Sequence, residues 1–287
     1  MISPTKSISS PASETQATQH LSLETSLIGT LAISRLNKEE TIRMLLGHVR
    51  EVRRERTPGA AMQVFGVNAQ VATLVRTNPR FAKAVASATV KYPDGISVVI
   101  ASHLLGRPLI SRIPGGEMME SLCRLGAKEG LSAYFLGGLP GAAERTAEVL
   151  KTRYPGLKIA GARCPPYNFE TDPEESAQVI KSIQESAPDM LFVGLGVPKQ
   201  EIWIAENSAI LPIGLAFPVG AALDTTAGLR KRAPVWARRT GTEWLYRLAM
   251  EPRRLWRRYL IGNPAFAVMI LRQWIRERTR RRSTPGA

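Results

Sequence analysis

A chain of 287 residues, 44% hydrophobic and 22% charged, can bury a large core, which excludes a fibrous or wholly disordered protein. The two cysteines, Cys123 and Cys164, have neither C-x-x-C nor zinc-binding spacing, so we expect reduced thiols and no metal. No stretch approaches the roughly 20 apolar residues that a membrane-spanning helix needs. Residues 1–20 are rich in Ser, Thr and Gln and lack the apolar run of a signal peptide, so we expect a disordered leader.

The net charge of +15 is concentrated near the C-terminus. Residues 230–287 hold 16 Lys and Arg against three Glu, a net charge of +13, whereas residues 1–229 hold 23 basic and 21 acidic groups. Four of the five Trp also lie in this tail. We therefore expect a near-neutral globular domain over residues 21–229 and a basic, tryptophan-rich appendage over residues 230–287.

Between these ends, short apolar runs alternate with segments of helical periodicity. The predicted strands are residues 27–33, 62–67, 89–92, 133–136, 157–160, 190–193 and 210–217. The predicted helices are residues 38–56, 70–87 with a break near Asn78 and Pro79, 96–105, 117–129, 140–154 and 173–186. This alternation predicts an α/β fold, a doubly wound, Rossmann-like and mostly parallel sheet with helices on both faces. Such sheets bind ligands at the carboxyl ends of their strands.

The clearest strand end is the glycine turn at residues 194–196, followed by Pro198, Lys199 and Gln200. Pro is favoured in the first turn of a helix, and the free N–H groups of a helix N-terminus attract anions. Lys199 and Gln200 would add a cation and an amide to an anion site there. An ordinary tight turn with a solvated Lys199 explains the same residues, because a glycine turn after a strand is a weak motif alone.

Polar residues also follow other predicted strands. These are Asn68, Asp94, Asp224 and the turn that holds Gly137 and Gly138. Each has a structural explanation too, since Asp94 suits a Pro-Asp-Gly turn and Asn68 and Asp224 suit helix N-caps. Together, at equivalent strand ends, they would converge on one crevice.

Several segments together resemble a known family. They are Tyr92-Pro-Asp-Gly-Ile96, Phe135-Leu-Gly-Gly138, Phe192-Val-Gly-Leu-Gly-Val-Pro-Lys-Gln-Glu-Ile-Trp-Ile204, Arg232-Ala-Pro234, Glu243-Trp-Leu-Tyr-Arg-Leu248 and Glu251-Pro252. In this order they resemble the WecG/TagA/CpsF glycosyltransferases, over about residues 27–259. The resemblance implies inverting transfer of a sugar from a UDP-sugar to a polyprenyl-diphosphate-linked sugar, at the cytoplasmic face of the bacterial plasma membrane, in surface polysaccharide synthesis.

The resemblance also assigns roles to residues. It implies that Asp94 is the general base, and that the substrates contact Asn68, Arg112, Tyr167, Gln200 and Asp224, near Lys199 and the Gly137-Gly138 turn. The chain has no Asp-x-Asp, which agrees with the metal-independent and cofactor-free chemistry that the resemblance implies. Three arginines match its C-terminal appendage, Arg247, Arg254 and Arg257, and the resemblance implies that they close over the leaving diphosphate.

Some positions depart from the family pattern. A site threonine is replaced by Gly66, the segment Thr-Gly-x-Asp reads Pro114-Gly-Gly-Glu117, and Gly-Gly-x-Phe-Asp reads Gly220-Ala-Ala-Leu-Asp224. Because these changes surround the implied sugar pocket, the donor sugar stays open among N-acetylmannosamine, glucose and a uronic acid. The oligomeric state also stays open, a homo-oligomer included.

Residues 253–261 alternate apolar and arginine pairs with helical spacing, which predicts an amphipathic helix on an anionic membrane surface. Residues 265–274 are apolar but too short to span a bilayer. A basic face packed on the globule and a nucleic-acid-binding arm are the alternatives. The lipid-linked acceptor favours the membrane over nucleic acid.

Two other classes of protein share parts of this pattern. A Rossmann-type NAD(P)-binding oxidoreductase would share the alternating units, but no Gly-x-Gly-x-x-Gly opens the first of them. A basic nucleic-acid-binding protein would use the tail, but it leaves the polar strand ends of the near-neutral globule unexplained.

Overall fold

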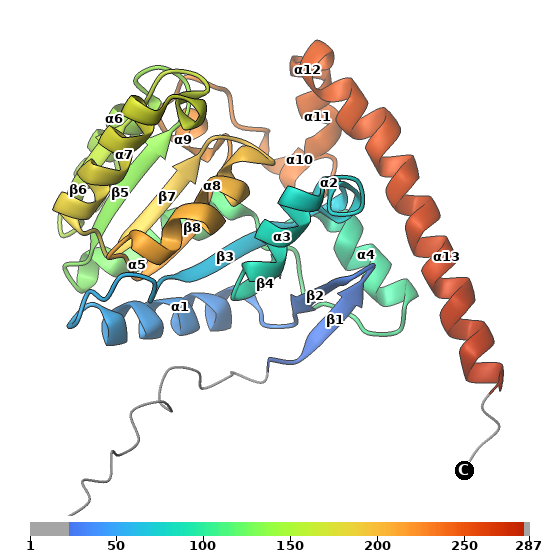
Figure 1. Cartoon of the computed structure of the whole chain (residues 1–287). Coiled ribbons are helices and arrows are strands. Elements are labelled where there is room, and N and C mark those ends of the chain that lie inside the picture. Colours follow the sequence, from blue (N-terminus) through green and yellow to red (C-terminus); the bar gives the residue numbers. More distant parts are fainter. Residues whose placement is uncertain (1–22, 284–287) are drawn as a thin grey trace, which may run out of the picture.

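The computed structural model describes residues 23–283, without the side chains of residues 238, 239, 254 and 281–283 (Figure 1). The predicted leader, residues 1–20, lies outside the described residues. Six strands form one parallel sheet in the order β4-β3-β8-β7-β5-β6. They are β3 (Met62–Val67), β4 (Val90–Pro93), β5 (Ser132–Gly137), β6 (Lys158–Arg163), β7 (Met190–Gly194) and β8 (Leu215–Pro218).

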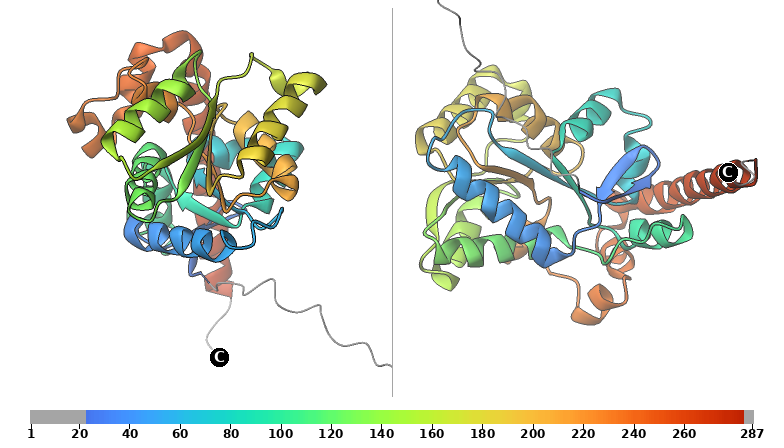
Figure 2. Two further views of the ribbon diagram at one scale, coloured as in Figure 1. Left: turned by 90° about the vertical axis from the view of Figure 1, so that its left-hand side faces the viewer. Right: turned by 90° about the horizontal axis from the view of Figure 1, so that it is seen from below.

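Helices cover both faces of this sheet, which confirms the predicted fold class (Figure 2). Neighbouring residues of a strand point to opposite faces, so Phe65 packs into one core and Val64 into the other. The first core receives α2 (Ala69–Leu74), α3 (Pro79–Ser87), α4 (Ile96–Leu104), α7 (Pro173–Ser186) and α8 (Lys199–Asn207). The second receives α1 (Lys38–Val52), α5 (Gly115–Lys128), α6 (Ala142–Arg153) and α9 (Ala222–Thr226). Two short 3-10 helices are Phe169–Thr171 and Ser208–Ile210.

Side-chain caps set several helix boundaries. Asn78 accepts a hydrogen bond from the N–H of Phe81, and Pro79 occupies the first turn of α3, so the predicted break in residues 70–87 is confirmed. Asp172 caps α7 in the same way, in front of Pro173. The helix starts therefore follow from local sequence.

Two predicted strands are wrong in extent. Residues 27–33 form a separate antiparallel hairpin, β1 (Thr25–Ile28) and β2 (Leu31–Ser34), because Gly29 reverses the chain with φ of +62°. Glycine adopts this left-handed conformation at little cost. Residues 210–217 contribute only their end to β8, and the preceding segment holds Pro212, which cannot donate to a strand ladder.

The C-terminal region is helical throughout its described part. It comprises α10 (Val235–Arg239), α11 (Glu243–Met250), α12 (Pro252–Trp256), the π-helical turn Arg257–Ile261 and α13 (Gly262–Ser283). The predicted amphipathic helix is thus divided between α12 and the π-helical turn; it buries Leu255 and Tyr259 and exposes Trp256, Leu260 and Ile261. Over residues 23–283, no helix is both long and apolar enough to cross a membrane.

Helix α13 packs along the side of the globule (Figure 1). One face buries Phe266, Met269 and Ile270 in the core that also contains residues of α2 and the hairpin. At the hairpin turn, Gln273 accepts from the N–H of Gly29 at 2.8 Å and donates to the carbonyl of Leu27 at 3.0 Å. The apolar run of residues 265–274 is therefore used in part for packing on the globule.

We predict that Phe266→Ala lowers the free energy of unfolding by about 3 kcal/mol, because it leaves a cavity between α13 and the globule. The matched control is Leu271→Ala on the same helix, whose side chain is 51% exposed and which should change stability by only about 0.5 kcal/mol. Urea unfolding measures both. Equal effects of the two substitutions would contradict the docking of α13 through this face.

Candidate functional site

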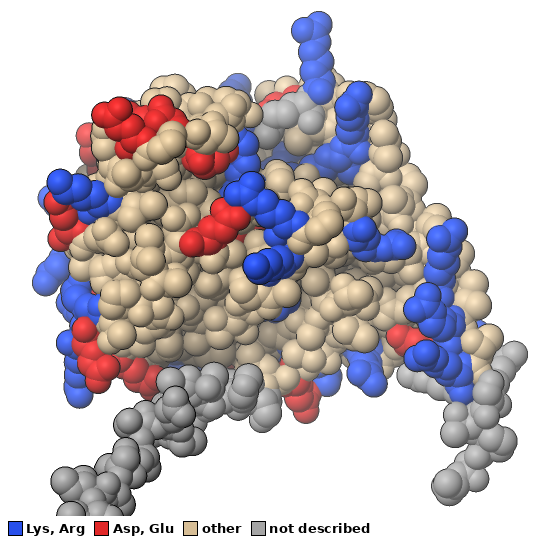
Figure 3. Space-filling view, in the orientation of Figure 1, with Lys and Arg blue, Asp and Glu red and all other residues tan. Residues whose placement is uncertain are grey.

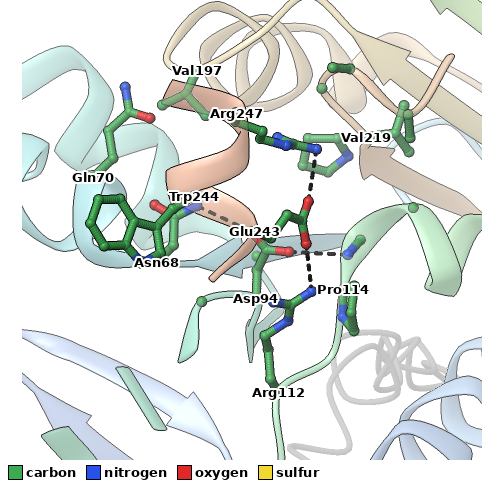
Figure 4. A pocket seen from close by; sticks show the side chains of 18 of the residues that line it. Asn68, Gln70, Asp94, Arg112, Pro114, Val197, Val219, Glu243, Trp244 and Arg247 are labelled. Carbon is green, nitrogen blue, oxygen red and sulfur yellow. Dashed lines mark hydrogen bonds and ion pairs between the residues drawn. The ribbon is translucent and has the colours of Figure 1, made fainter. Parts of the chain in front are cut away.

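A cavity of about 590 Å³ opens at the carboxyl ends of β4, β3, β8 and β7. Its floor is formed by the residues that follow these strands, and its roof by α11 and the π-helical turn (Figure 4). Five predicted site residues line it: Asn68, Asp94, Arg112, Gln200 and Arg247. Of the residues predicted to converge from the strand ends, the structure brings Asn68, Asp94 and Gln200 into this cavity.

Asp94 lies at the floor, directly after β4. Its Oδ1 accepts from the backbone N–H of Gly115 at 3.1 Å, and its Oδ2 accepts from Nδ2 of Asn68 at 3.2 Å. Asn68 cannot turn away, because its Oδ1 caps α2 by accepting from the N–H of Val71 at 3.2 Å. Asn68 is thus a helix cap and a cavity residue at once, and the Asp94 carboxylate is held in a single orientation.

Gly66 determines how closely the floor can pack. A Cβ at position 66 would lie 2.8 Å from the hydroxyl of Tyr92 and 2.9 Å from Cβ of Asp94. Such contacts are too short for any side chain without a shift of the floor. Gly66, where the chain departs from the family pattern, therefore leaves room for the side chain of Tyr92. Tyr92 lines the cavity and was not among the residues predicted from the sequence.

Two arginines meet one carboxylate above Asp94. Oε2 of Glu243 lies 2.8 Å from Arg112, and Oε1 lies 3.1 Å from Arg247, one turn further along α11. Figure 4 shows Glu243 between the two guanidinium groups. Arg112 comes from the globule, whereas Arg247 and Glu243 come from α11 in the C-terminal region. The Arg112–Glu243 ion pair therefore connects α11, in the roof of the cavity, to the wall.

The start of α8 forms a second wall, where Gln200 and Glu201 are both buried. Oε1 of Gln200 accepts from the N–H groups of Gly196 and Gly220, at 3.1 and 3.0 Å. The expectation that the glycine turn offers free N–H groups to an anion is therefore wrong for Gly196, because Gln200 already occupies its N–H.

Glu201 is 3% exposed and lines the cavity. Its Oε1 accepts from Nε2 of Gln200 at 2.8 Å, and its Oε2 has no hydrogen-bond partner among residues 23–283. Burial raises the pKa of Glu201 to about 7, opposed by the hydrogen bond from Gln200 and by the charge of Arg258. This carboxyl group therefore changes its charge near neutral pH.

Gly137, Gly138 and Asp224 form a separate cluster at the end of β5. Oδ1 of Asp224 accepts from the N–H of Leu139 at 2.8 Å and lies beside Gly138, while Arg230 pairs with Oδ2 at 3.1 Å. Asp224 lies in the first turn of α9, not at its N-cap. None of the three predicted residues lines the cavity.

Lys199 and Tyr167 also lie outside the cavity lining. Lys199 pairs with Glu170 at 2.6 Å, contacts Asn168, and lies 4.3 Å from the ring centroid of Tyr167, which is 88% exposed. The alternative of a simply solvated Lys199 is thus wrong, because an acid partner holds it.

The three predicted appendage arginines are placed differently. Arg247 lines the cavity, whereas Arg257 is exposed, with its guanidinium 5.3 Å from the ring of Trp256. The side chain of Arg254 lies outside the described residues. Arg258, which the sequence analysis did not propose, lines the cavity beside Glu201. Glu243 was also missed, although it opens the Glu-Trp-Leu-Tyr-Arg-Leu segment.

Over the described part of the chain, no group of three or more His, Cys, Asp or Glu is arranged to hold a metal ion. The charged groups that line the cavity are five arginines, among them Arg112, Arg247 and Arg258, and five carboxylates, among them Asp94, Glu201 and Glu243. Such a set can bind a phosphate-bearing ligand through guanidinium groups and exchange a proton through Asp94.

Comparisons with known proteins identify the family of the chain. Residues 26–280 match the sequence model described as the glycosyl transferase WecG/TagA/CpsF family. The chain is 34% identical over 209 residues to an N-acetylglucosaminyldiphosphoundecaprenol N-acetyl-beta-D-mannosaminyltransferase of Bacillus spizizenii (strain ATCC 23059 / NRRL B-14472 / W23), covering 73% of this chain and 78% of that protein. It is 32% identical over 194 residues to a protein with the same name from Staphylococcus aureus (strain MW2), covering 68% and 74%.

The raised pKa of Glu201 predicts a pH-dependent stability. Between about pH 4.5 and 7 the unfolded chain ionises this carboxyl while the folded protein keeps it protonated, so folding stability is lost as the pH rises through this window. The loss attributable to Glu201 is on the order of 3 kcal/mol, and Glu201→Gln should remove it. Urea unfolding at pH 5 and pH 8 measures the difference.

The control for Glu201 is Glu206→Gln on the same helix, where Arg80 lowers the pKa of the exposed carboxyl. That substitution should leave the loss of stability between pH 5 and 8 as large as in the unsubstituted protein. An undiminished loss in Glu201→Gln would show that another group causes the pH dependence.

Proposed function

Because the chain belongs to the WecG/TagA/CpsF family of glycosyl transferases, we propose that it transfers a hexose-type sugar from a UDP-sugar to a polyprenyl-diphosphate-linked sugar, with inversion. The protein is a glycosyltransferase, and the names of its relatives specify an N-acetylmannosaminyl donor group and an N-acetylglucosaminyl-diphosphate lipid. The product would serve a bacterial surface polysaccharide: an exopolysaccharide, a capsule, a teichoic acid or a common antigen. One observation carries the proposal: the fixed Asp94 carboxylate shares a cavity with five arginines, three of which are Arg112, Arg247 and Arg258.

Asp94 is the proposed general base. In an inverting transfer the acceptor hydroxyl attacks the anomeric carbon from the face opposite the diphosphate, the new C–O bond forms as the bond to UDP breaks, and the hydroxyl proton moves to the base. The donors from Asn68 and Gly115 hold the Asp94 carboxylate in one orientation beneath the cavity. Such placement is required for proton transfer, which typically contributes about 10²–10⁴-fold to the rate.

The leaving group is UDP, so negative charge accumulates on a diphosphate. Arg112, Arg247 and Arg258 line the cavity and would supply the positive field that a metal ion supplies in other sugar-nucleotide transferases. Two of them come from the C-terminal region, so that region would take part in catalysis as well as in location. We accordingly propose a transfer that needs no metal ion and no cofactor.

The acceptor is carried by a lipid, so the protein has to work beside a membrane. Trp256, Leu260 and Ile261 are exposed between 42% and 60% next to Arg257, close to the roof of the cavity. Figure 3 shows further basic side chains spaced along α13 and above the globule near α12. Apolar and cationic groups in this combination bind anionic lipid surfaces. We propose a peripheral position on the cytoplasmic face of the plasma membrane, with no nucleic-acid partner.

The test is a UDP-release assay with UDP-N-acetylmannosamine, UDP-glucose and UDP-glucuronate, and a short-chain lipid-diphosphate-linked N-acetylglucosamine as acceptor. We expect acceptor-dependent release from one donor, a product of inverted anomeric configuration by NMR, and full activity in EDTA. Loss of activity in EDTA that Mg²⁺ or Mn²⁺ restores would contradict metal independence. No transfer from any UDP-sugar would contradict the proposed function.

We predict that Asp94→Asn lowers kcat by about 10²-fold or more, because the amide cannot take the acceptor proton. The affinity for UDP, measured by calorimetry, should stay nearly unchanged, because the arginines carry that interaction. Unchanged turnover, or loss of UDP binding together with turnover, would assign Asp94 a structural or binding role.

Asn68 and Asn78 provide a matched pair, since each is an Asn N-cap that accepts from the N–H three residues on. Alanine at either position should cost about 1 kcal/mol of folding stability. Only Asn68 also holds Asp94, so we expect Asn68→Ala alone to lower kcat by more than about tenfold. An equal fall of kcat in Asn78→Ala would show that the loss of a cap, and not of the Asp94 contact, affects turnover.

A further inference from the structure

Glu243 is an acid in a strongly basic region, and it projects into the cavity. Its carboxylate contacts Arg112 at 2.8 Å through one oxygen and Arg247 at 3.1 Å through the other. The side chains of Glu243 and Arg112 are only 21% and 15% exposed. Both guanidinium groups are therefore occupied by an internal anion, at the place where a phosphate-bearing ligand would need them.

A diphosphate competes well for the same two arginines. A guanidinium binds planar carboxylate and phosphate oxygens through the same pairs of N–H donors. A carboxylate brings one negative charge and two oxygens, whereas the diphosphate of a nucleotide brings more charge and more acceptor oxygens. Simultaneous binding of both anions would place like charges a few ångströms apart in a partly buried cavity, which is unfavourable.

We propose that Glu243 is a positioning residue that exchanges with the donor: it holds Arg112 and Arg247 in the empty cavity and releases them to the diphosphate of the bound nucleotide. After transfer, the return of Glu243 to the two arginines would compete with UDP and speed its release. This inference rests on the proposed function, because it takes the nucleoside diphosphate as the incoming anion.

A purely structural role for Glu243 predicts the opposite sign. If the carboxylate only fastened α11 to the wall, its loss would free Arg247 from the cavity and weaken the binding of a diphosphate. If it is a competing anion, its loss leaves two unneutralised guanidinium groups, and a diphosphate binds more tightly. Glu243 and Arg247 have the i, i+4 spacing of an ordinary ion pair within a helix. The contact between Glu243 and Arg112 is a tertiary contact, because 131 residues separate the two along the chain.

The test compares Glu243→Gln with the unsubstituted protein by calorimetric titration with UDP and, separately, with inorganic diphosphate. We expect about tenfold tighter binding of both ligands by Glu243→Gln, an effect that shrinks at high salt. We also expect a lower kcat, because UDP leaves more slowly. Glu243→Asp keeps the charge and should bind both ligands almost as the unsubstituted protein does.

Two controls isolate the exchange. Glu206→Gln removes the same charge from an exposed pair with Arg80 and should leave both affinities unchanged. On an Arg112→Ala background, Glu243→Gln should gain much less affinity, because one of the two released guanidinium groups is gone. Trypsin digestion of Glu243→Gln with and without UDP checks that α11 stays docked.

The outcomes separate this inference from the proposed function. If Glu243→Gln binds UDP and diphosphate no more tightly than the unsubstituted protein does, the proposed exchange is wrong. If the unsubstituted protein nevertheless binds UDP, the proposed function still stands. If the unsubstituted protein binds no UDP, the proposed function fails, and the titration with inorganic diphosphate still decides for or against the exchange.

Discussion

The hydrogen bond between Asn68 and Asp94 connects the fold to the chemistry. It joins the ends of two adjacent parallel strands, β3 and β4, and the same asparagine starts α2. Helix α2 packs on α13, and α13 continues the π-helical turn that carries Arg258 into the cavity. Asn68 therefore contacts the floor of the site directly, and it is linked to the roof through the packing of α2 on α13. Loss of this amide would remove both the hydrogen bond to Asp94 and the cap of α2.

Around Asp94, two acids of the cavity lie beside an arginine from the other part of the chain. Glu243 of the roof pairs with Arg112 of the wall, and Glu201 of the wall lies near Arg258 of the roof. Unpaired arginines in a partly buried cavity would repel one another, and unpaired acids would repel a nucleotide. Such pairing keeps the charges that line the cavity close to balance and leaves cations available to an incoming anion.

The sequence allowed the sheet and the cavity floor to be predicted because their determinants are local. The apolar runs of β3 and β7 are typical of strands buried on both faces of a sheet. The start of α7 can be predicted from two neighbouring residues, the N-cap Asp172 and Pro173 in the first turn. The hairpin was missed because apolar alternation continues on both sides of Gly29. Arg257 and Arg258 both belong to the arginine face of the predicted helix, and the structure places Arg258 in the cavity, on the π-helical turn. The contact of Glu243 with Arg112 spans 131 residues, which no local pattern encodes.

The contact between Gln273 and the β1–β2 hairpin joins segments separated by about 245 positions along the chain. On the ribosome, the hairpin stays without this packing partner while about 240 further residues are added to the chain. Contacts of such long range form late and slowly. The central sheet can assemble during synthesis, but α13, which supports the roof, is translated after all six strands of the sheet. Completion of the cavity is therefore separated in time from the folding of the sheet on which it lies.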